Sequence, residues 1–328
     1  MTDVLIVDAA HPDAARMAQA ADCLRRGGLV AFPTETVYGL GVHALDRAAV
    51  ARLFVAKGRP ANDPLIVHVP SLDAAAPLVA SLPRAASALA AAFWPGPLTL
   101  VLPRSAAVPD AVTAGLPTVA VRVPAHPVAR ALVAAAGIPI AAPSANLFSR
   151  PSPTSAQHVL HDLGGRIDLI VDGGPTTIGV ESTVVDLTAV PPLVLRPGAV
   201  TLDMLRAIVP GIRARSDAPV DDTAPQVSPG LLGRHYAPRT PLTLYRGAGA
   251  QRRLETDADD MRARGLRVTV LDWPGDLDSV AKRLYAALRE ADAAGADAIL
   301  ARDVDATGGL ADALRDRLRR AAATIVDA

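Results

Sequence analysis

The sequence is poor in cysteine and in aromatic residues: one cysteine, Cys23, stands in 328 residues, and aromatics make up 3%. A single thiol cannot form an internal disulfide, so the composition fits a reducing compartment. The chain has no run of about 18 apolar residues, and its first residues lack a basic start followed by an apolar stretch. These absences argue against a membrane span and a signal peptide, and we expect a soluble, cytoplasmic protein.

Charge of either sign is not in surplus, because Lys plus Arg and Asp plus Glu both number 33. A general nucleic-acid binder usually carries a basic excess, although a local basic face remains compatible with this balance. The motifs GxxxxGK[ST], HExxH, CxxC and GxSxG are also missing, which argues against several large enzyme classes. Residues 39–44 match the loose dinucleotide pattern GxGxxA, but they follow a polar turn instead of opening a helix, so the match is weak.

What the sequence does have is apolar residues, at 50%, in a chain long enough for two folded units. Strand-like and helix-like patterns mix irregularly through residues 1–208, with Pro- and Gly-rich turns between them. This pattern predicts an α/β domain with a mixed, twisted sheet. The clearest predicted strands are Val4–Val7, Leu29–Phe32, Leu65–His68, Leu98–Leu102, Thr118–Val123, Ile138–Ala142, Leu169–Asp172, Thr183–Asp186 and Leu193–Arg196.

Residues 209–240 are rich in Pro, Gly and Asp without periodicity, which is typical of a linker. A passive linker rarely needs aromatic side chains, yet His235 and Tyr236 stand together in it. Strands and helices alternate regularly through residues 241–328. This alternation predicts a small domain with a parallel, Rossmann-like sheet, ending in a helix at 310–323.

Polar residues follow the predicted strand Leu29–Phe32. In Pro33-Thr34-Glu35-Thr36 they form either a capping turn with surface threonines or a loop whose hydroxyls bind a small polar substrate. A second polar segment, Lys57-Gly58-Arg59-Pro60, ends a predicted helix. Its two cations either complement the helix dipole or bind phosphate, with lysine as a point charge and arginine as a planar fork.

Further polar groups stand at the ends of other strands. Ser144 and Asn146 follow an apolar strand, where ligands usually bind in α/β sheets, although turn chemistry explains them equally well. Ser182 precedes a strand and either caps it or faces a ligand. Arg122 interrupts an apolar strand, where a charge is costly unless it is paired or faces a pocket, and Arg196 ends another strand. His68 ends a strand too, although a lone histidine is more often structural.

Taken in order, these segments resemble the threonylcarbamoyl-AMP synthase family, which is built on the YrdC-like domain. The resemblance is dense over about residues 15–200 and resumes at His235-Tyr236-Ala237-Pro238, which is similar to the linker of two-domain members. It is carried by AFPTETVYGLG, KGRP with NDPL, PLIVHV, WPGPLTLVLP, TVAVRVPAHP, PIAAPSAN, SRPSPTSA, DGG, GVESTVVDL and LRPG. The chain departs from the family pattern at Asp63, where Asn is usual, so either Asn62 or Asp63 could touch a ligand. It departs again at Asp316-Arg317, where Asn-Arg is common.

The resemblance implies two groups of ligand contacts. Those expected to bind ATP are Lys57, Arg59, Asn62, Ser144, Asn146, Ser152, Arg196 and Tyr236. Those expected to bind L-threonine are Thr34, His68, Thr118, Arg122 and Ser182, with the Arg122 fork on the threonine carboxylate. It also implies the substrates ATP, L-threonine and bicarbonate, Mg²⁺ with the ATP and no organic prosthetic group. A tRNA threonylcarbamoyl-transferase complex would take the product.

The activity implied is synthesis of threonylcarbamoyl-adenylate with release of pyrophosphate, for N6-threonylcarbamoyladenosine in tRNA. No serine-histidine or cysteine-histidine pairing suggests a covalent intermediate, so we expect catalysis by alignment and by neutralisation of phosphate charge. We also expect the linker to cross the mouth of the site and close over the substrates. Two alternatives stay open: a non-catalytic module that recognises folded RNA, and carbamoyl or adenylyl transfer to another amine.

Overall fold

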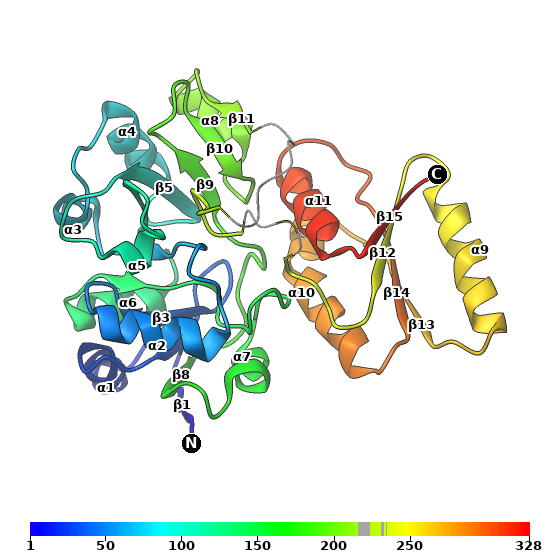
Figure 1. The fold of residues 1–328 in the computed structure, drawn as a ribbon, viewed down its shortest axis with the longest axis horizontal. Helices are drawn as coiled ribbons and strands as arrows, with labels where there is room; N and C mark the ends of the chain where they lie inside the picture. Colours follow the sequence, from blue (N-terminus) through cyan, green and yellow to red (C-terminus); the bar gives the residue numbers. More distant parts are fainter. Residues whose placement is uncertain (216–223, 231–232, 234) are drawn as a thin grey trace.

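The computed structural model describes residues 1–215, 224–230, 233 and 235–328, and this part of the chain forms two lobes (Figure 1). The predicted linker at 209–240 contains all of the remaining residues, so that prediction lies partly outside the described residues. The first lobe holds the N-terminus and all elements through β11, and the second lobe begins with β12. No helix of the described residues is long and apolar enough to cross a membrane.

The first lobe is built on one large mixed sheet, as the sequence predicts. Its strands are β1 (Asp3–Ile6), β2 (Val30–Phe32), β3 (Gly39–His43), β4 (Ile66–His68), β5 (Leu98–Pro103), β6 (Thr118–Arg122), β7 (Ile140–Ala141), β8 (Leu169–Asp172), β9 (Thr183–Asp186), β10 (Leu193–Arg196) and β11 (Arg213–Ala214). They lie in the order β1-β8-β2-β3-β7-β4-β6-β5-β9-β10-β11. Neighbours run parallel in β4 and β6 but antiparallel in β2 and β3.

Helices cover both faces of this sheet and enclose two apolar clusters, one of them beneath α1 and α6. The helices are α1 (Ala14–Arg25), α2 (Arg47–Lys57), α3 (Leu72–Ala75), the 3-10 turn η1 (Ala76–Leu78), α4 (Arg84–Phe93), α5 (Asp110–Thr113), α6 (Pro127–Ala136), α7 (Ala156–Leu163) and α8 (Leu202–Ile208). Helix α2 shows how local sequence sets these bounds. The Asp46 side chain accepts from two N–H groups of its first turn, and Gly58 ends it with a φ of 62°, which glycine adopts at little cost.

Strand β3 differs from the prediction. No strand is expected there, because Gly39-Leu40-Gly41 lacks the β-branched residues that mark strands. Instead, these residues pair antiparallel with β2. A Cβ on Gly41 would lie 2.8 Å from Phe32 Cε1, so glycine is needed for this close packing. The match to GxGxxA therefore lies within a strand, which rules out the dinucleotide interpretation.

The register of the central strands brings predicted site residues together. Strands β4 and β6 pair in parallel so that His68 stands opposite Arg122. Strand β7 pairs with β4 on its other side, and the chain runs from β7 directly to Ser144. Polar residues that are distant in sequence thus come onto neighbouring strands, but β7 runs antiparallel to β4, so Ser144 and His68 lie towards opposite ends of β4.

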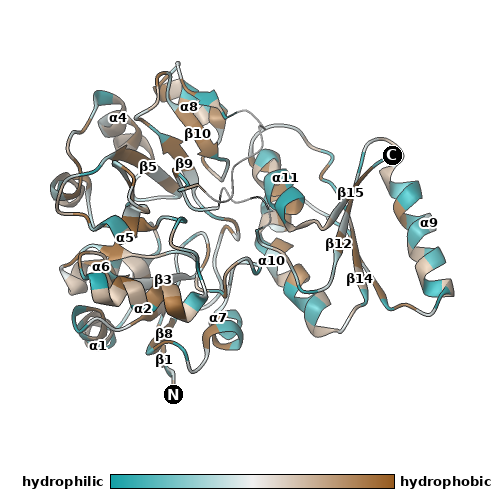
Figure 2. Ribbon diagram, in the orientation of Figure 1, coloured by the Kyte–Doolittle hydropathy of each residue, from teal (hydrophilic) through white to brown (hydrophobic). Residues whose placement is uncertain are grey.

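The second lobe is a four-stranded, fully parallel sheet, as predicted, in the order β13-β14-β12-β15. The sequence does not predict β15, which follows the last helix. The elements are β12 (Leu242–Arg246), α9 (Ala250–Ala263), β13 (Val268–Leu271), α10 (Leu277–Ala293), β14 (Ala298–Arg302), α11 (Leu310–Ala321) and β15 (Thr324–Asp327). Helix α9 covers the outer face and is largely hydrophilic (Figure 2), whereas α10 and α11 lie between the small sheet and the first lobe.

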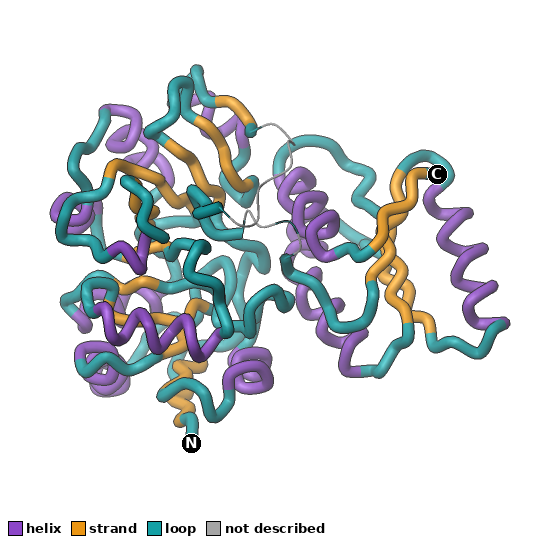
Figure 3. Tube along the Cα trace, viewed as in Figure 1, coloured by secondary structure: helices purple, strands orange, loops and turns teal. Residues whose placement is uncertain are grey.

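The two lobes share one apolar cluster. Val37 and Val180 of the first lobe pack with residues of α10 and α11, including Leu284 and Leu314. Tyr236 joins them from the connector, as we call the chain between β11 and β12. Figure 3 shows that the second lobe presents helices to this boundary, whereas the first lobe presents mainly loops. Loop residues of the first lobe, such as Val37 and Val180, are therefore buried against the second lobe.

Candidate active site

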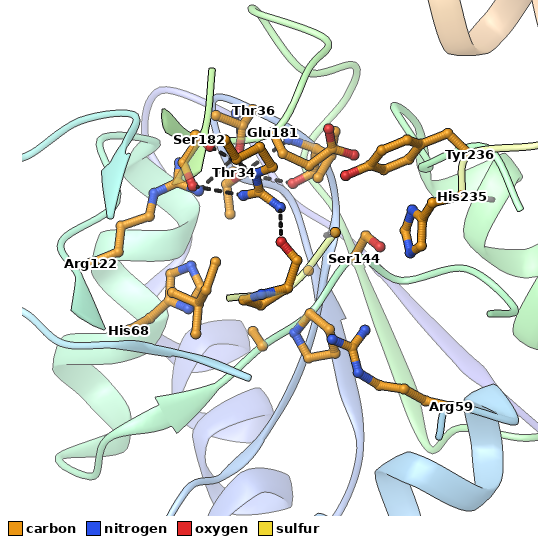
Figure 4. A pocket seen from close by; sticks show the side chains of 18 residues that line it. Thr34, Thr36, Arg59, His68, Arg122, Ser144, Glu181, Ser182, His235 and Tyr236 are labelled. Carbon is orange, nitrogen blue, oxygen red and sulfur yellow. Dashed lines mark hydrogen bonds between the residues drawn. The ribbon is translucent and has the colours of Figure 1, made fainter. Parts of the chain in front are cut away.

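A cleft opens in the first lobe beside strands β3, β4 and β6. Polar side chains from both lobe and connector face it (Figure 4). The residues lining it include Thr34, Thr36, Arg59, His68, Arg122, Ser144, Glu181, Ser182, Arg196, Pro229, Gly230, His235 and Tyr236. Eight of the thirteen residues predicted to bind ligand thus lie around one cavity. We call the part near Arg122 and His68 the Arg122 end, and the part near Arg196 and Tyr236 the linker end.

Arg122 is held in one orientation by its own lobe. Its Nη2 lies 2.6 Å from Glu35 Oε1, and its Nη1 donates to Thr36 Oγ1 at 3.0 Å. The second Glu35 oxygen accepts from the backbone N–H groups of Ala125 and His126, at the start of α6. Burial opposes ionisation of Glu35, but the charge and hydrogen bonds of Arg122 outweigh it and lower the pKa of this carboxyl. The guanidinium has five N–H groups, so after its bonds to these described residues it keeps donors for a ligand carboxylate.

His68 is 3% exposed, and its Nδ1 has no hydrogen-bond partner among the described residues. Burial, with the nearby charge of Arg122, lowers its pKa to about 3, so the ring is neutral at pH 7. Its ring meets the edge of Phe32 with centroids 6.2 Å apart. A buried polar atom without a partner is unusual in a folded protein. Facing a cleft, it suits a hydrogen bond to a bound polar ligand.

Lys57 is 1% exposed, and its Nζ donates to the carbonyl oxygens of Ser144 and Asn146. Lys57 stands in the last turn of α2, so its position is also compatible with the alternative, a cation that complements the helix dipole. Lys57 does not line the cleft; it fixes the loop that carries Ser144 into it. Burial, with the charge of Arg59, holds the pKa of its ammonium well below the ordinary value. Its contact with ATP stays a prediction.

Arg59 lines the cleft while bound to the turn behind it. Its Nη2 lies 2.9 Å from Asp63 Oδ2 and donates to the Pro64 carbonyl at 2.8 Å. Asp63 is fully buried, so it anchors Arg59, and neither Asp63 nor Asn62 lines the cleft. The Asn62 amide instead donates to the carbonyl of Ala224 in the connector. The structure therefore supports neither Asn62 nor Asp63 as a direct ligand contact.

Ser144 and Asn146 stand on one loop but differ in position. Ser144 lines the cleft (Figure 4), whereas Asn146 does not. The Asn146 amide donates to the carbonyls of Leu147 and Arg150, which braces the loop. Its Oδ1 is buried without a hydrogen-bond partner among the described residues.

Arg196 ties the linker end together. Its Nη2 donates to Ser182 Oγ at 3.2 Å and its Nε to the Ser182 carbonyl at 3.1 Å. Its Nη1 donates to the carbonyl of Pro229 in the connector at 3.1 Å. Ser182 Oγ also lies 2.8 Å from Thr99 Oγ1. Arg196 therefore joins a loop of the sheet to the connector beside the cleft.

Tyr236 is 1% exposed and has a φ of 62°, which is rare for a bulky residue. Its neighbours hold it from two sides: His235 N donates to the Arg320 carbonyl in α11, and Ala237 N donates to the Ser149 carbonyl. The Tyr236 hydroxyl, which lies at the cleft, has no hydrogen-bond partner among the described residues. A Cβ on Gly230 would stand 2.5 Å from that hydroxyl, so the connector closely covers it.

Two predicted contacts, besides Lys57, Asn62 and Asn146, lie away from the cleft lining. Thr118 begins β6 and pairs with Pro103, whereas Arg122 ends that strand, about 13 Å further on at ordinary strand rise. Ser152 is buried and donates to Glu181 Oε1, so it braces a residue of the cleft. The roles of both toward a ligand stay predictions.

Glu181 lines the cleft although its local sequence does not predict it as a site residue. Its Oε2 accepts from Arg317 Nε at 2.8 Å and from Tyr285 Oη at 2.9 Å, both in the second lobe. Burial opposes its ionisation, but Arg317 outweighs this and lowers its pKa to about 2. One signal was available: Arg317 falls between Leu314, Leu318 and Ala321, on the apolar stripe of its helix. A cation there must meet a buried partner.

A metal site finds no support in the side chains around the cleft. No group of three or more His, Cys, Asp or Glu residues among those described could hold a metal ion. The acids nearest the cleft, Glu35 and Glu181, are each bound to an arginine. These residues do not fit a protein-held Mg²⁺.

The fold and the cleft together define a two-domain α/β protein with a ligand site between the ends of a mixed sheet and a connector. A family model described as "Telomere recombination" matches residues 22–198, and one described as "Threonylcarbamoyl-AMP synthase, C-terminal domain" matches residues 200–323. The chain therefore belongs to the threonylcarbamoyl-AMP synthase family, as the resemblance in its sequence indicates, and it is an enzyme.

Individual relatives agree over nearly the whole chain. A threonylcarbamoyl-AMP synthase of Pyrococcus abyssi is 46% identical over 92% of both chains. One of Bacillus subtilis is 44% identical over 94% of this chain and 93% of its own. A crystal structure described as P. abyssi Sua5 complexed with L-threonine matches with a TM-score of 0.95 at 43% identity, covering both chains fully. Escherichia coli YciO matches at 26% identity with a TM-score of 0.54, over 60% of this chain and 95% of its own.

Proposed function

We propose that the enzyme forms threonylcarbamoyl-AMP and pyrophosphate from L-threonine, bicarbonate and ATP, and that the product serves N6-threonylcarbamoyladenosine modification of tRNA. The observation that carries this proposal is a cleft lined by two buried arginines, Arg122 and Arg196, which are each fixed by neighbouring residues. Such a cleft suits an amino acid carboxylate beside a polyphosphate. The archaeal structure that matches over the full chain is described with L-threonine, which supports the same assignment.

The Arg122 end suits threonine. The Arg122 donors that its own lobe does not use would bind the threonine carboxylate, and the fork geometry would fix its plane. His68, Thr34 and Ser182 line the same cleft and offer short polar groups for the threonine hydroxyl and amine. A neutral His68 adds no positive charge that would repel an approaching ammonium.

The linker end suits ATP. Arg59 and Arg196 would neutralise phosphate oxygens, and Ser144, held by Lys57, would donate to them. The Tyr236 hydroxyl, buried without a partner among the described residues, would bind the nucleotide. Mg²⁺ enters this proposal only as the cation that the ATP phosphates carry, because the described side chains do not fit a metal site.

The chemistry follows from alignment of these substrates. The threonine amine attacks the bicarbonate carbon, and loss of water leaves N-carboxythreonine. An oxygen of the new carbamate group then attacks the α-phosphorus of ATP. The bond between that phosphorus and the oxygen bridging to the β-phosphate breaks, and pyrophosphate leaves. The protein holds the groups in line and neutralises the leaving charge, which removes entropic and electrostatic parts of the barrier.

The connector belongs to this proposal as a cover. Pro229, Gly230, His235 and Tyr236 line the cleft, so closure over bound substrates would keep water from a labile carbamate and its adenylate. A tRNA threonylcarbamoyl-transferase complex would take the product.

A substrate panel tests the proposal. Purified protein is incubated with Mg²⁺, ATP, bicarbonate and one amino acid at a time, and pyrophosphate release is measured. We expect release with threonine and bicarbonate together and none above background when either is omitted. If another amine gives as much pyrophosphate as threonine, threonine is not the specific substrate. If the protein binds RNA and releases no pyrophosphate with any amine, the non-catalytic alternative is favoured.

A further inference from the structure

Glu181 belongs to the first lobe, but the second lobe supplies most of its partners. Arg317 Nε donates to Oε2 at 2.8 Å, and the Tyr285 hydroxyl reaches both oxygens, at 3.0 and 2.9 Å. Ser152 is its partner from the first lobe. Glu181 also lines the cleft, beside Ser182 (Figure 4). A side chain of the site is thus fixed from the other domain.

The ion pair between Arg317 and Glu181 is not explained by stability alone. The Arg317 side chain is fully buried, and taking two charges out of water costs about as much as their attraction returns. What a buried, hydrogen-bonded ion pair does supply is one defined geometry. Arg317 also lies 5.4 Å from the centre of the Tyr236 ring, and the Tyr285 ring lies 5.6 Å from it. The same two side chains therefore contact Glu181 and Tyr236.

The backbone next to Glu181 is docked just as closely. Gly179 has a φ of 89°, and a Cβ there would lie 2.3 Å from the Ala281 carbonyl oxygen in α10. Val180 is fully buried in the apolar cluster of the second lobe. The segment 179–181 therefore lies directly against α10.

From this segment, hydrogen bonds continue to the Arg122 end. Ile178 N donates to the Glu35 carbonyl at 2.8 Å, and Gly179 N donates to the Thr36 carbonyl at 3.0 Å. Glu35 and Thr36 are the residues that hold Arg122. An unbroken set of contacts thus runs from α10 and α11 through residues 178–181 to the predicted threonine contacts.

We propose that Tyr285 and Arg317 are positioning residues of the second lobe, which set Glu181 and Tyr236 and thereby complete the cleft for threonine and ATP. This inference rests on the proposed function. It gives the C-terminal domain a role in the first reaction itself, through two side chains that touch no substrate.

Two tyrosines of the second lobe offer a matched test. Tyr285→Phe removes the hydroxyl that bonds Glu181 and keeps the ring against Tyr236. Tyr245→Phe removes a hydroxyl that bonds Asp257 at 2.8 Å, inside the second lobe and away from the cleft. Both variants of the full chain lose one hydroxyl that bonds a carboxylate. For each, kcat and KM for threonine, the Kd of ATP and the Tm are measured.

We expect Tyr285→Phe to lower kcat/KM for threonine at least tenfold and to change the Kd of ATP less than twofold. Tyr245→Phe should leave both values within twofold of the unchanged protein, with a similar Tm. Arg317→Met, which removes the contacts to both Glu181 and Tyr236, should weaken ATP binding as well. If that variant does not fold, the tyrosine pair still decides the question.

Equal kinetics for Tyr285→Phe and Tyr245→Phe would overturn the inference and reduce the contact to domain docking. If the protein without any substitution releases no pyrophosphate from ATP with threonine and bicarbonate, the proposed function itself is overturned. The two failures are thus seen in different samples.

Discussion

Arg122 and Arg196 each end a strand of the same sheet and line the same cleft, but they are held differently. Arg122 is bound by Glu35 and Thr36, which belong to its own lobe. Arg196 binds Ser182 and the Pro229 carbonyl of the connector, beside Tyr236 and a carboxylate that the second lobe holds. The Arg122 end is therefore held directly by its own lobe and is reached by the second lobe only through residues 178–181, whereas the linker end is held directly by three parts of the chain. Preformed sites lose less free energy in ordering themselves on binding.

The largest effect is expected from breaking the Arg122 end. Arg122→Lys keeps a charge but loses the planar fork that serves Glu35, Thr36 and the ligand together. We expect kcat/KM for threonine to fall about a hundredfold, about 2.7 kcal/mol of transition-state stabilisation, while ATP affinity changes little. Steady-state kinetics and direct ATP binding measure the two quantities. Loss of ATP affinity with normal threonine kinetics would place Arg122 on the other substrate.

The next effect is at the loop that Lys57 supports. Lys57→Met keeps most of the buried apolar volume but leaves the carbonyls of Ser144 and Asn146 without their shared donor. We expect ATP affinity and product formation to fall at least tenfold, about 1.4 kcal/mol. Because the side chain is buried, the Tm should fall too, and ATP binding is compared at a temperature where the variant is folded. Unchanged ATP affinity would show that Lys57 and the loop it supports do not contribute to ATP binding.

A smaller but cleaner effect is expected at Tyr236. Tyr236→Phe removes a hydroxyl that has no hydrogen-bond partner among the described residues, so folding should lose little. We expect ATP affinity to fall about fivefold, about 1 kcal/mol, with the Tm unchanged, because the lost partner is a ligand. Normal ATP binding and full turnover by this variant would leave the connector as a tether.

How far the sequence predicts this site depends on how far apart the partners are in the chain. Arg122, His68 and Ser144 could be found because a polar residue at the end of an apolar strand stands out locally. Glu181 and Arg317 are 136 residues apart, and no local pattern pairs them. Lys57 was predicted as a site residue but with its ammonium toward ligand, because a helix end does not show which way a side chain turns.

The smallest effect compares the two ends through their histidines. His68 and His235 are both buried, and burial lowers the pKa of each to about 3, against about 6.5 in an unfolded chain. The unfolded chain then binds more protons below pH 6.5, so stability is full above that pH and falls as the pH drops toward 3. We expect the free energy of unfolding to decrease from pH 7 to pH 5, as measured by urea denaturation.

Single variants separate the two contributions. His68→Asn and His235→Asn should each weaken the pH dependence of stability, and by similar amounts if the two ends are equally buried. If neither variant alters the slope between pH 7 and pH 5, then the two rings are not held neutral in the folded protein.

Isotope tracing identifies the product of the enzyme. The purified enzyme is given ATP, L-threonine and carbon-13 bicarbonate, and the reaction is analysed by mass spectrometry with pyrophosphate measured in parallel. We expect an adenylate that contains AMP, threonine and one labelled carbon, formed in equal amount with pyrophosphate. An adenylate of threonine without the labelled carbon, or pyrophosphate released without any threonine-containing adenylate, would contradict it.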